Sequence, residues 1–132
     1  MDEQCYYRLS VKGIVIDKDG RIMLSRQDDG TWDLLGGGLD HEEDPIAGLK
    51  REIFEETGLR VLSVSASPKY FVTAPRSDVS LQTYLANVIY EITLENLDFV
   101  PSDECQELRF FSVTELAGAD MLPNIEKLIK LL

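Results

Sequence analysis

Stretches rich in β-branched and aromatic residues occupy most of this chain, and a helical spacing of apolar residues replaces them in two places. The first helical pattern is an i, i+3, i+7 stripe formed by Ile46, Leu49 and Ile53. Asp44 is a favourable N-cap, and Pro45 suits the first helical position because its missing N–H would have no partner there. Gly58 is a natural left-handed end. The pattern therefore predicts a helix that starts at Asp44, stops at Gly58 and buries one face.

A second helical pattern follows Pro123. Its apolar stripe, typical of an amphipathic helix, consists of Ile125, Leu128, Ile129 and Leu132. Strands are expected at residues 6–17, 21–27, 31–35, 59–66, 69–74, 79–93 and 108–113. The KDG turn at 18–20 should join the first two as a hairpin, and Gly36, Gly37 and Gly38 should end the third. Because strands outnumber helices in a mixed order, the sequence predicts an α/β sandwich with a mixed sheet between helices.

The composition narrows the classes of function. The 132 residues suit one domain over residues 1–132, and the apolar fraction of 44% argues against disorder. A net charge of −11 repels phosphate backbones, which makes polymeric nucleic acid a poor partner. No apolar run reaches the ~20 residues of a membrane span, and the N-terminus lacks a signal-peptide core, so the expected location is the cytoplasm. Cys5 and Cys105, without CxxC spacing, are expected to be free thiols.

Seven acidic residues and only two basic ones lie within residues 37–59. Glu52, Glu55 and Glu56 fall within one arc of about 100° on the predicted helix, beside its apolar stripe. One interpretation is an ordinary solvated face. However, Glu52 and Glu56 form a like-charge i, i+4 pair with no basic residue four positions on, which destabilises a bare helix by roughly a few tenths of a kcal/mol. Uncompensated carboxylates beside a core favour a hard cation such as Mg²⁺ or Mn²⁺.

Residues 37–59, GGLDHEEDPIAGLKREIFEETGL, match the Nudix signature at all of its fixed positions. These positions are Gly37, Glu43, Arg51, Glu52, Ile53, Glu55, Glu56, Gly58 and Leu59. The chain therefore resembles the Nudix hydrolase family and its MutT-like pyrophosphohydrolases, and DECQELRFFSVTEL at 103–116 is similar to the family as well. Two departures precede the helix: Leu35 stands where many relatives have proline, and residues 40–43 read DHEE instead of Glu-x-Gly-Glu.

The resemblance implies a Nudix-type α/β/α sandwich with a mixed β-sheet between helices. It also implies hydrolysis of a pyrophosphate bond in a nucleoside diphosphate linked to another moiety, by attack of metal-activated water on phosphorus. The expected substrate is a nucleoside triphosphate or a similar small nucleotide, and the expected cofactor is Mg²⁺ or Mn²⁺. The protein is expected to act as a monomer or homodimer, without a membrane or polymeric nucleic acid as partner.

The resemblance also assigns roles to residues of the signature. The metal would be held by Glu52, Glu55, Glu56 and the backbone carbonyl of Gly37. Arg51 and Glu43 would form a pair that ties the loop to the helix and orients the catalytic glutamate. Gly58 would support the site by ending the helix.

The general base is expected to be Glu55 or Glu104, with Glu107 as a weaker third candidate. Substrate contacts are less well marked. Arg26 could meet a distal phosphate and Trp32 could stack on a base, although exposed ion pairing and core packing are the simpler interpretations.

Other functions on the same fold stay open. A Nudix-fold sensor would bind a nucleotide without cleaving it, although all box glutamates are present here. A hydrolase of ADP-ribose or a nucleotide sugar is a substrate variant; Pro75 resembles a mark of ADP-ribose hydrolases but lies in a turn-like segment where proline is common. An isomerase of an isoprenoid diphosphate would need a reactive cysteine near the site. His41, the only histidine, is expected to be exposed or beside the substrate, and not to be a ligand.

Overall fold

A computed structural model of the protein describes residues 5–76 and 83–132. These residues form eight strands and three helices. The strands are β1 (Tyr6–Ile14), β2 (Ile22–Arg26), β3 (Trp32–Asp33), β4 (Leu35–Gly38), β5 (Val61–Val64), β6 (Tyr70–Pro75), β7 (Thr83–Leu94) and β8 (Glu107–Phe111). The helices are α1 (Pro45–Thr57), α2 (Val113–Ala117) and α3 (Pro123–Ile129). Of the predicted strand 79–93, residues 79–82 lie outside the described residues.

Five strands form a mixed sheet in the order β4-β1-β7-β5, with β6 also paired to β7. β1 and β7 run parallel, with Val11 opposite Val88, and the other pairings of this sheet are antiparallel. β5 pairs with the last residues of β7 and β6 with its first half, so both share one edge of that long strand. The prediction of a mixed sheet is confirmed.

The other three strands form a second sheet, in the order β3-β2-β8, which the sequence did not predict. The predicted strand 31–35 is divided between the two sheets, because β3 pairs with β2 whereas β4 pairs with β1, and buried Leu34 lies between them. The glycines do not end the strand, since β4 continues through Gly38. The expected hairpin is reduced to one bridge between Ile16 and Ile22, because β2 pairs mainly with β8.

The ends of α1 are those that the sequence predicts. The Asp44 side chain accepts a hydrogen bond from the amide of Ala47, and Gly58 closes the helix with a φ of 75°. Leu49 and Ile53 are fully buried, as the apolar stripe requires. They pack against β1, β4 and β7, so the core fixes which face of α1 turns toward the sheet.

The C-terminal part holds one helix that was predicted and one that was not. α2 begins where a strand end was expected, because Ser112 and Glu115 form a capping box. α3 begins at Pro123 as predicted. It buries Ile125 and Leu128. The helix is shorter than predicted, since it ends at Ile129 and leaves Leu132 40% exposed.

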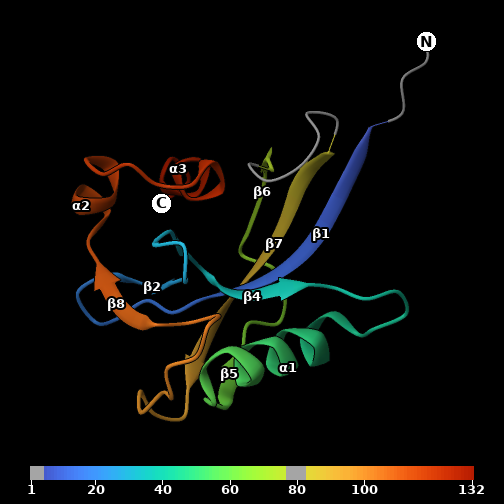
Figure 1. The fold of residues 1–132 in the computed structure, drawn as a ribbon, viewed down its shortest axis with the longest axis horizontal. Helices are drawn as coiled ribbons and strands as arrows, with labels where there is room; N and C mark the ends of the chain where they lie inside the picture. Colours follow the sequence, from blue (N-terminus) through green and yellow to red (C-terminus); the bar gives the residue numbers. More distant parts are fainter. Residues whose placement is uncertain (1–4, 77–82) are drawn as a thin grey trace.

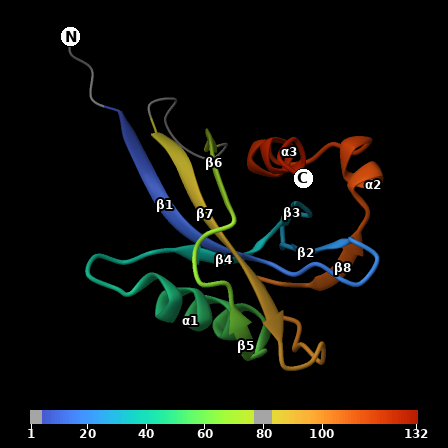
Figure 2. The same cartoon turned by 180° about the vertical axis from the view of Figure 1, so that it is seen from behind.

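The helices lie on both sides of the strands (Figure 1). α1 occupies one side and α2 with α3 the other, and the view from behind in Figure 2 shows the same layers. One hydrophobic cluster fills the side of α1, and a second cluster fills the side of α2 and α3. The predicted α/β/α sandwich with a mixed sheet between helices is therefore confirmed. Within the described residues, no helix is long and apolar enough to cross a lipid bilayer.

Candidate functional site

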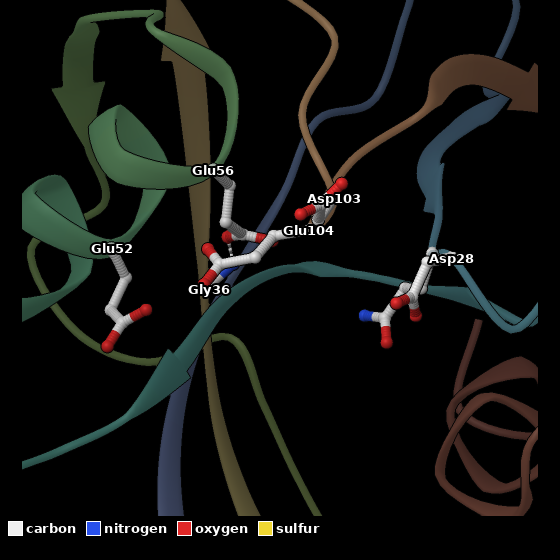
Figure 3. A pocket seen from close by; sticks show the side chains of 7 residues that line it. Asp28, Gly36, Glu52, Glu56, Asp103 and Glu104 are labelled. Carbon is white, nitrogen blue, oxygen red and sulfur yellow. Dashed lines mark hydrogen bonds between the residues drawn. The ribbon is translucent and has the colours of Figure 1, made fainter.

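An acidic pocket of about 290 Å³ opens beside α1 and β4. It is lined by Gln27, Asp28, Gly36, Glu52, Glu56, Asp103 and Glu104. Figure 3 shows that its carboxylates come from three directions: from α1, from the loop after β2 and from the loop before β8. None of these seven lining residues is basic, so they offer no cationic side chain to an anionic ligand.

Glu56 is buried in the wall of this pocket, with 5% of its surface exposed. Its Oε1 accepts a hydrogen bond from the amide of Gly36 at 2.7 Å. Burial raises the pKa of this carboxyl group to about 8, and the opposing effects of the Lys12 ammonium and the Gly36 amide offset only part of the rise. This shift favours the protonated form of Glu56 near neutral pH. A cation in the pocket would favour the ionised form.

Glu52 lies one helical turn before Glu56, against Gly37 of β4. A Cβ atom at position 37 would lie 2.6 Å from Oε2 of Glu52, so glycine leaves the space that this carboxylate occupies. The other carboxylate oxygen accepts a hydrogen bond from Arg51 at 3.3 Å. The Glu52 carboxylate and the backbone of Gly37, both predicted as metal ligands, are thus neighbours.

The predicted pair of Arg51 and Glu43 is present. Two parallel hydrogen bonds join them, from Nε to Oε2 at 2.7 Å and from Nη2 to Oε1 at 3.0 Å. The Arg51 guanidinium, together with the amide of Asp40, holds the pKa of Glu43 below its usual range. A Cβ atom at Gly48 would lie 2.9 Å from the Glu43 carboxylate, so this helix glycine makes room for the pair. The loop before α1 is therefore tied to the helix turn that carries Glu52.

The three candidates for the general base lie in different surroundings. Glu55 is 54% exposed at its side chain, bonds to Arg51 at 3.2 Å and does not line the pocket. Glu107 pairs with Arg26 at 3.3 Å and is also outside the pocket lining. Glu104 lines the pocket. Of these three residues, Glu104 alone faces the space beside the α1 carboxylates.

The loop that carries Glu104 is fastened to the last turn of α1. The Ser102 hydroxyl donates a hydrogen bond to the backbone carbonyl of Glu56 at 2.9 Å and accepts one from the amide of Glu104 at 3.2 Å. The amide of Val100 donates to the carbonyl of Thr57 at 2.9 Å. α1 therefore positions this loop in addition to its own carboxylates.

Two expected substrate contacts, Arg26 and Trp32, are not among the residues that line the pocket. Arg26 bonds to Glu107 and Gln106. Trp32 packs edge-on against Phe111 and lines a separate hollow of about 220 Å³. His41 is exposed in the turn before α1 and is not among the lining residues.

Four of the seven lining residues were not predicted from the sequence. One is Gly36 of β4, which precedes the predicted Gly37. The other three are Gln27, Asp28 and Asp103. They stand in loops, and no local motif marks them, because they reach the pocket only through the packing of the second sheet beside α1. Asp103 is the first residue of DECQELRFFSVTEL and precedes the predicted base Glu104, and this position is the only signal in the sequence that points to it.

The donor set of the pocket suits a hard divalent cation. Carboxylate and backbone oxygens are the ligands that Mg²⁺ and Mn²⁺ prefer, and the buried carboxyl of Glu56 would gain a counter-charge from such an ion. In the part of the chain that the structure describes, no three Asp, Glu, His or Cys side chains are already gathered around one point.

Comparison with known proteins agrees with this geometry. The NUDIX domain matches residues 6–132. A MutT-like protein of Streptomyces ambofaciens is 48% identical over 56 residues, which cover 42% of this chain and 36% of that protein. The nucleoside triphosphatase NudI of Salmonella paratyphi B is 29% identical over 122 residues, which cover 81% of this chain and 84% of NudI. The crystal structure of the MutT protein of Methanosarcina mazei Go1 is similar with a TM-score of 0.80 at 21% identity, covering 98% of this chain and 95% of that one.

These similarities differ in what they establish. The match to the Streptomyces protein spans little more than a third of that relative's length, 36%. The likeness to the Methanosarcina structure, at 21% identity, is a likeness of fold. The NUDIX domain, in contrast, extends from β1 to the last residue and includes every residue that lines the acidic pocket. On this match, the chain belongs to the Nudix family.

Proposed function

We propose that the protein is a metal-dependent hydrolase that cleaves a pyrophosphate bond in a small nucleotide, such as a nucleoside triphosphate. The observation that carries this proposal is the acidic pocket, in which Glu52 and Glu56 of the Nudix helix stand beside two glycines of β4. NudI, a nucleoside triphosphatase similar over most of its length, supports the choice of substrate class.

The charge of the pocket explains why a cation is needed. Five of its seven lining residues are acidic, and the chain carries a net charge of −11, so a polyphosphate would be repelled from the protein alone. When bound, Mg²⁺ or Mn²⁺ would supply Lewis-acid stabilisation of the phosphoryl oxygens and acidify water. The same charge favours a small nucleotide over polymeric nucleic acid, for a protein acting as a monomer or homodimer.

The roles of the α1 residues follow from their positions. Glu52 and Glu56 would hold the metal, with the carbonyl of Gly37 as a further ligand. Arg51 would orient Glu52 while Glu43 fixes the arginine from the loop side. Such partners behind metal ligands are commonly worth about 10–100-fold in metal affinity or activity.

Glu55 and Glu104 would have different tasks. Glu104 faces the pocket and would accept the proton of the water that attacks phosphorus, so it is the favoured general base. Glu55 holds Arg51 and reaches the pocket only if its side chain leaves that arginine. The role of Glu55 as a metal ligand or as the general base stays a prediction, and Glu104 is the preferred base.

A nucleotide panel tests the function. The protein is incubated with nucleoside triphosphates, ADP-ribose, nucleotide sugars and an isoprenoid diphosphate, each with and without Mg²⁺, and the products are resolved by chromatography. We expect a nucleoside monophosphate and pyrophosphate, or a nucleoside diphosphate and phosphate, only with the metal. Reaction in H₂¹⁸O then shows which phosphorus is attacked.

Other outcomes assign other functions. Tight nucleotide binding without turnover would identify a sensor, and rearrangement of the isoprenoid diphosphate an isomerase. Among the described cysteines, Cys105 is buried and Cys5 is exposed, and neither lines the acidic pocket. The matched control is Glu126→Gln, an exposed glutamate on α3, which should behave as the wild type.

A further inference from the structure

Lys12 is a buried lysine in the middle of β1, with 6% of its surface exposed. Its ammonium group donates to the carbonyl of Gly36 at 3.1 Å, to the carbonyl of Leu34 at 3.5 Å and to Oδ2 of Asp33 at 3.3 Å. Removing a cation from water costs several kcal/mol unless it is paired and fully hydrogen-bonded. Lys12 does not line the acidic pocket, so its burial needs a different explanation from direct contact with a substrate.

Gly36 links Lys12 to the pocket. This residue has a φ of 118°, and a Cβ atom there would overlap the carbonyl oxygen of Val11, so its backbone conformation requires glycine. Its amide donates to Glu56 at 2.7 Å, while its carbonyl accepts from Lys12 at 3.1 Å. Lys12 therefore binds the carbonyl group of Gly36, and Glu56 binds the amide group of the same residue.

The Asp33 carboxylate that pairs with Lys12 is itself held by a hydrogen bond from a buried asparagine. Oδ1 of Asp33 accepts a hydrogen bond from Asn124 at 3.0 Å, and the same amide group donates to Asn87 at 3.0 Å. Asn87 and Asn124 are buried, on β7 and α3. The ammonium group is thus anchored to the layer opposite α1, and its position relative to β4 is set by the core.

We propose that Lys12 is a positioning residue of the proposed reaction: it fixes the carbonyl of Gly36 and so keeps the amide of Gly36 against Glu56. This inference rests on the proposed function, in which Glu56 holds the metal. Lys12 acts through β4 and touches neither substrate nor metal. A loose Gly36 would leave Glu56 without its partner and misplace the carboxylate.

The competing explanation is structural: Lys12 would only neutralise Asp33 in the core. Two variants separate these explanations. Asp33→Asn removes the ion pair but leaves both carbonyls for the lysine to bind. Lys12→Met in the Asp33→Asn background removes the lysine as well, without leaving an unpaired carboxylate at position 33. Lys127→Met is a remote control, because Lys127 also donates to a backbone carbonyl, that of Thr73, at 2.6 Å.

Three measurements are compared between these variants. They are the Mn²⁺ Kd from electron paramagnetic resonance, kcat and KM at saturating Mg²⁺, and hydrogen exchange of the Gly36 amide. For Lys12→Met/Asp33→Asn, relative to Asp33→Asn, we expect a Kd about tenfold weaker, a kcat at least about tenfold lower and exchange about tenfold faster, in the range for a lost orienting partner. KM should change less than about threefold. Lys127→Met should stay within about threefold of the wild type in all three, and Asp33→Asn is the reference against which the double variant is compared.

Loss of the lysine charge alone must also be excluded. Lys12→Arg keeps the positive charge at position 12, so this variant separates the loss of charge from the loss of the hydrogen-bond geometry. Should the double variant not fold, Lys12→Arg replaces it: arginine keeps the charge, but its planar group donates in a different geometry. The proposal expects faster Gly36 exchange in this variant, and a charge-only role expects none.

The inference is overturned if Lys12→Met/Asp33→Asn melts at a lower temperature than Asp33→Asn but matches it in Kd, kcat and exchange. It is also overturned if Lys12→Arg matches the wild type in the exchange of the Gly36 amide. If the wild type hydrolyses nothing in the nucleotide panel, the proposed function fails instead, while Mn²⁺ affinity and Gly36 exchange still decide the role of Lys12.

Discussion

The acidic pocket has two walls that are built differently. The α1 wall carries Glu52 and Glu56 on a capped helix that buries Leu49 and Ile53 completely, and each carboxylate has a fixed partner. The loop wall carries Asp103 and Glu104, both exposed residues on the segment before β8. This segment depends on Ser102 and on the backbone of α1 for its position.

The difference separates two requirements of the proposed chemistry. Metal ligands must be held in advance, because coordination geometry tolerates little error. Burial of Glu56 raises its pKa, and a bound cation would favour its ionised form. A general base must approach a water molecule whose position depends on the substrate, so an exposed and adjustable carboxylate suits the task. Changes in the α1 wall should therefore abolish activity, and changes in the loop wall should reduce it.

The largest effect is expected from Glu56→Gln. Metal stabilisation of the transition state is worth roughly several kcal/mol, so loss of this ligand should lower kcat roughly a thousandfold. Glutamine can still accept the hydrogen bond of the Gly36 amide and carries no charge, so the melting temperature without metal should stay equal or rise. Steady-state kinetics with Mg²⁺ and thermal unfolding check both. A kcat near that of the wild type would remove Glu56 from the metal site.

A smaller effect is expected from Glu104→Gln on the loop wall. Loss of a general base typically costs about 10²–10⁴-fold, and we expect roughly a hundredfold loss of kcat with Mn²⁺ affinity unchanged. Glu107→Gln is the matched control. Glu107 accepts a hydrogen bond from Arg26, so this variant should keep nearly the kcat of the wild type. Equal losses in Glu104→Gln and Glu55→Gln would show that the base is not confined to the loop wall.

Ser102→Ala should cost about tenfold in kcat, because misplacing a catalytic group by a fraction of an ångström is enough for such a loss. Ser102→Thr keeps the hydroxyl and should restore most of the rate. Kinetics of Ser102→Ala in the Glu104→Gln background sharpen the comparison of the walls. If Ser102 acts through Glu104, the two losses should not add; full additivity would assign the serine to α1 instead.

The smallest effect concerns pH. The pKa of Glu56 is raised to about 8 in the folded protein, first by burial, and its ordinary value is 4.5. Metal must displace this proton, so Mn²⁺ affinity should rise about fivefold between pH 7 and 8 and level off above. The metal-free fold binds a proton that the unfolded chain has lost, so its stability should fall as pH rises from about 4.5 to 8. Titration of Mn²⁺ binding and melting temperature, with Glu56→Gln as control, test both slopes.

The α1 wall could be predicted from the sequence because its determinants are local. The cap at Asp44, the stop at Gly58 and the glutamates between them lie on one continuous helix. α2 was also within reach, since Ser112 and Glu115 form a capping box that is visible as a spacing in the sequence. It was missed because the apolar residues before it favoured a longer strand.

The remaining features depend on tertiary structure. Asp28 joins the pocket only because the chain changes sheets at Leu34, and no spacing in the sequence marks that switch. Lys12 stands in a strand where a polar residue is expected to face solvent. Lys12 is buried because residues 33–36 supply carbonyl groups and a carboxylate that bind its ammonium group. The sequence pattern predicts only the end of a strand at these residues.

The parallel pairing of β1 with β7 also determines when the site can form. Val11 and Val88 are adjacent in space, yet most of the chain lies between them. Pairings of this kind close long loops and form late in folding. β4 and α1 pack on β1, so the α1 wall lacks its full support until β7 has been synthesised and has joined the sheet. Until β7 has been synthesised, the edge of β1 that will bind β7 has no partner, and an unpaired strand edge favours pairing with other chains. The divalent cation of the proposed site can therefore stabilise only the completely folded protein.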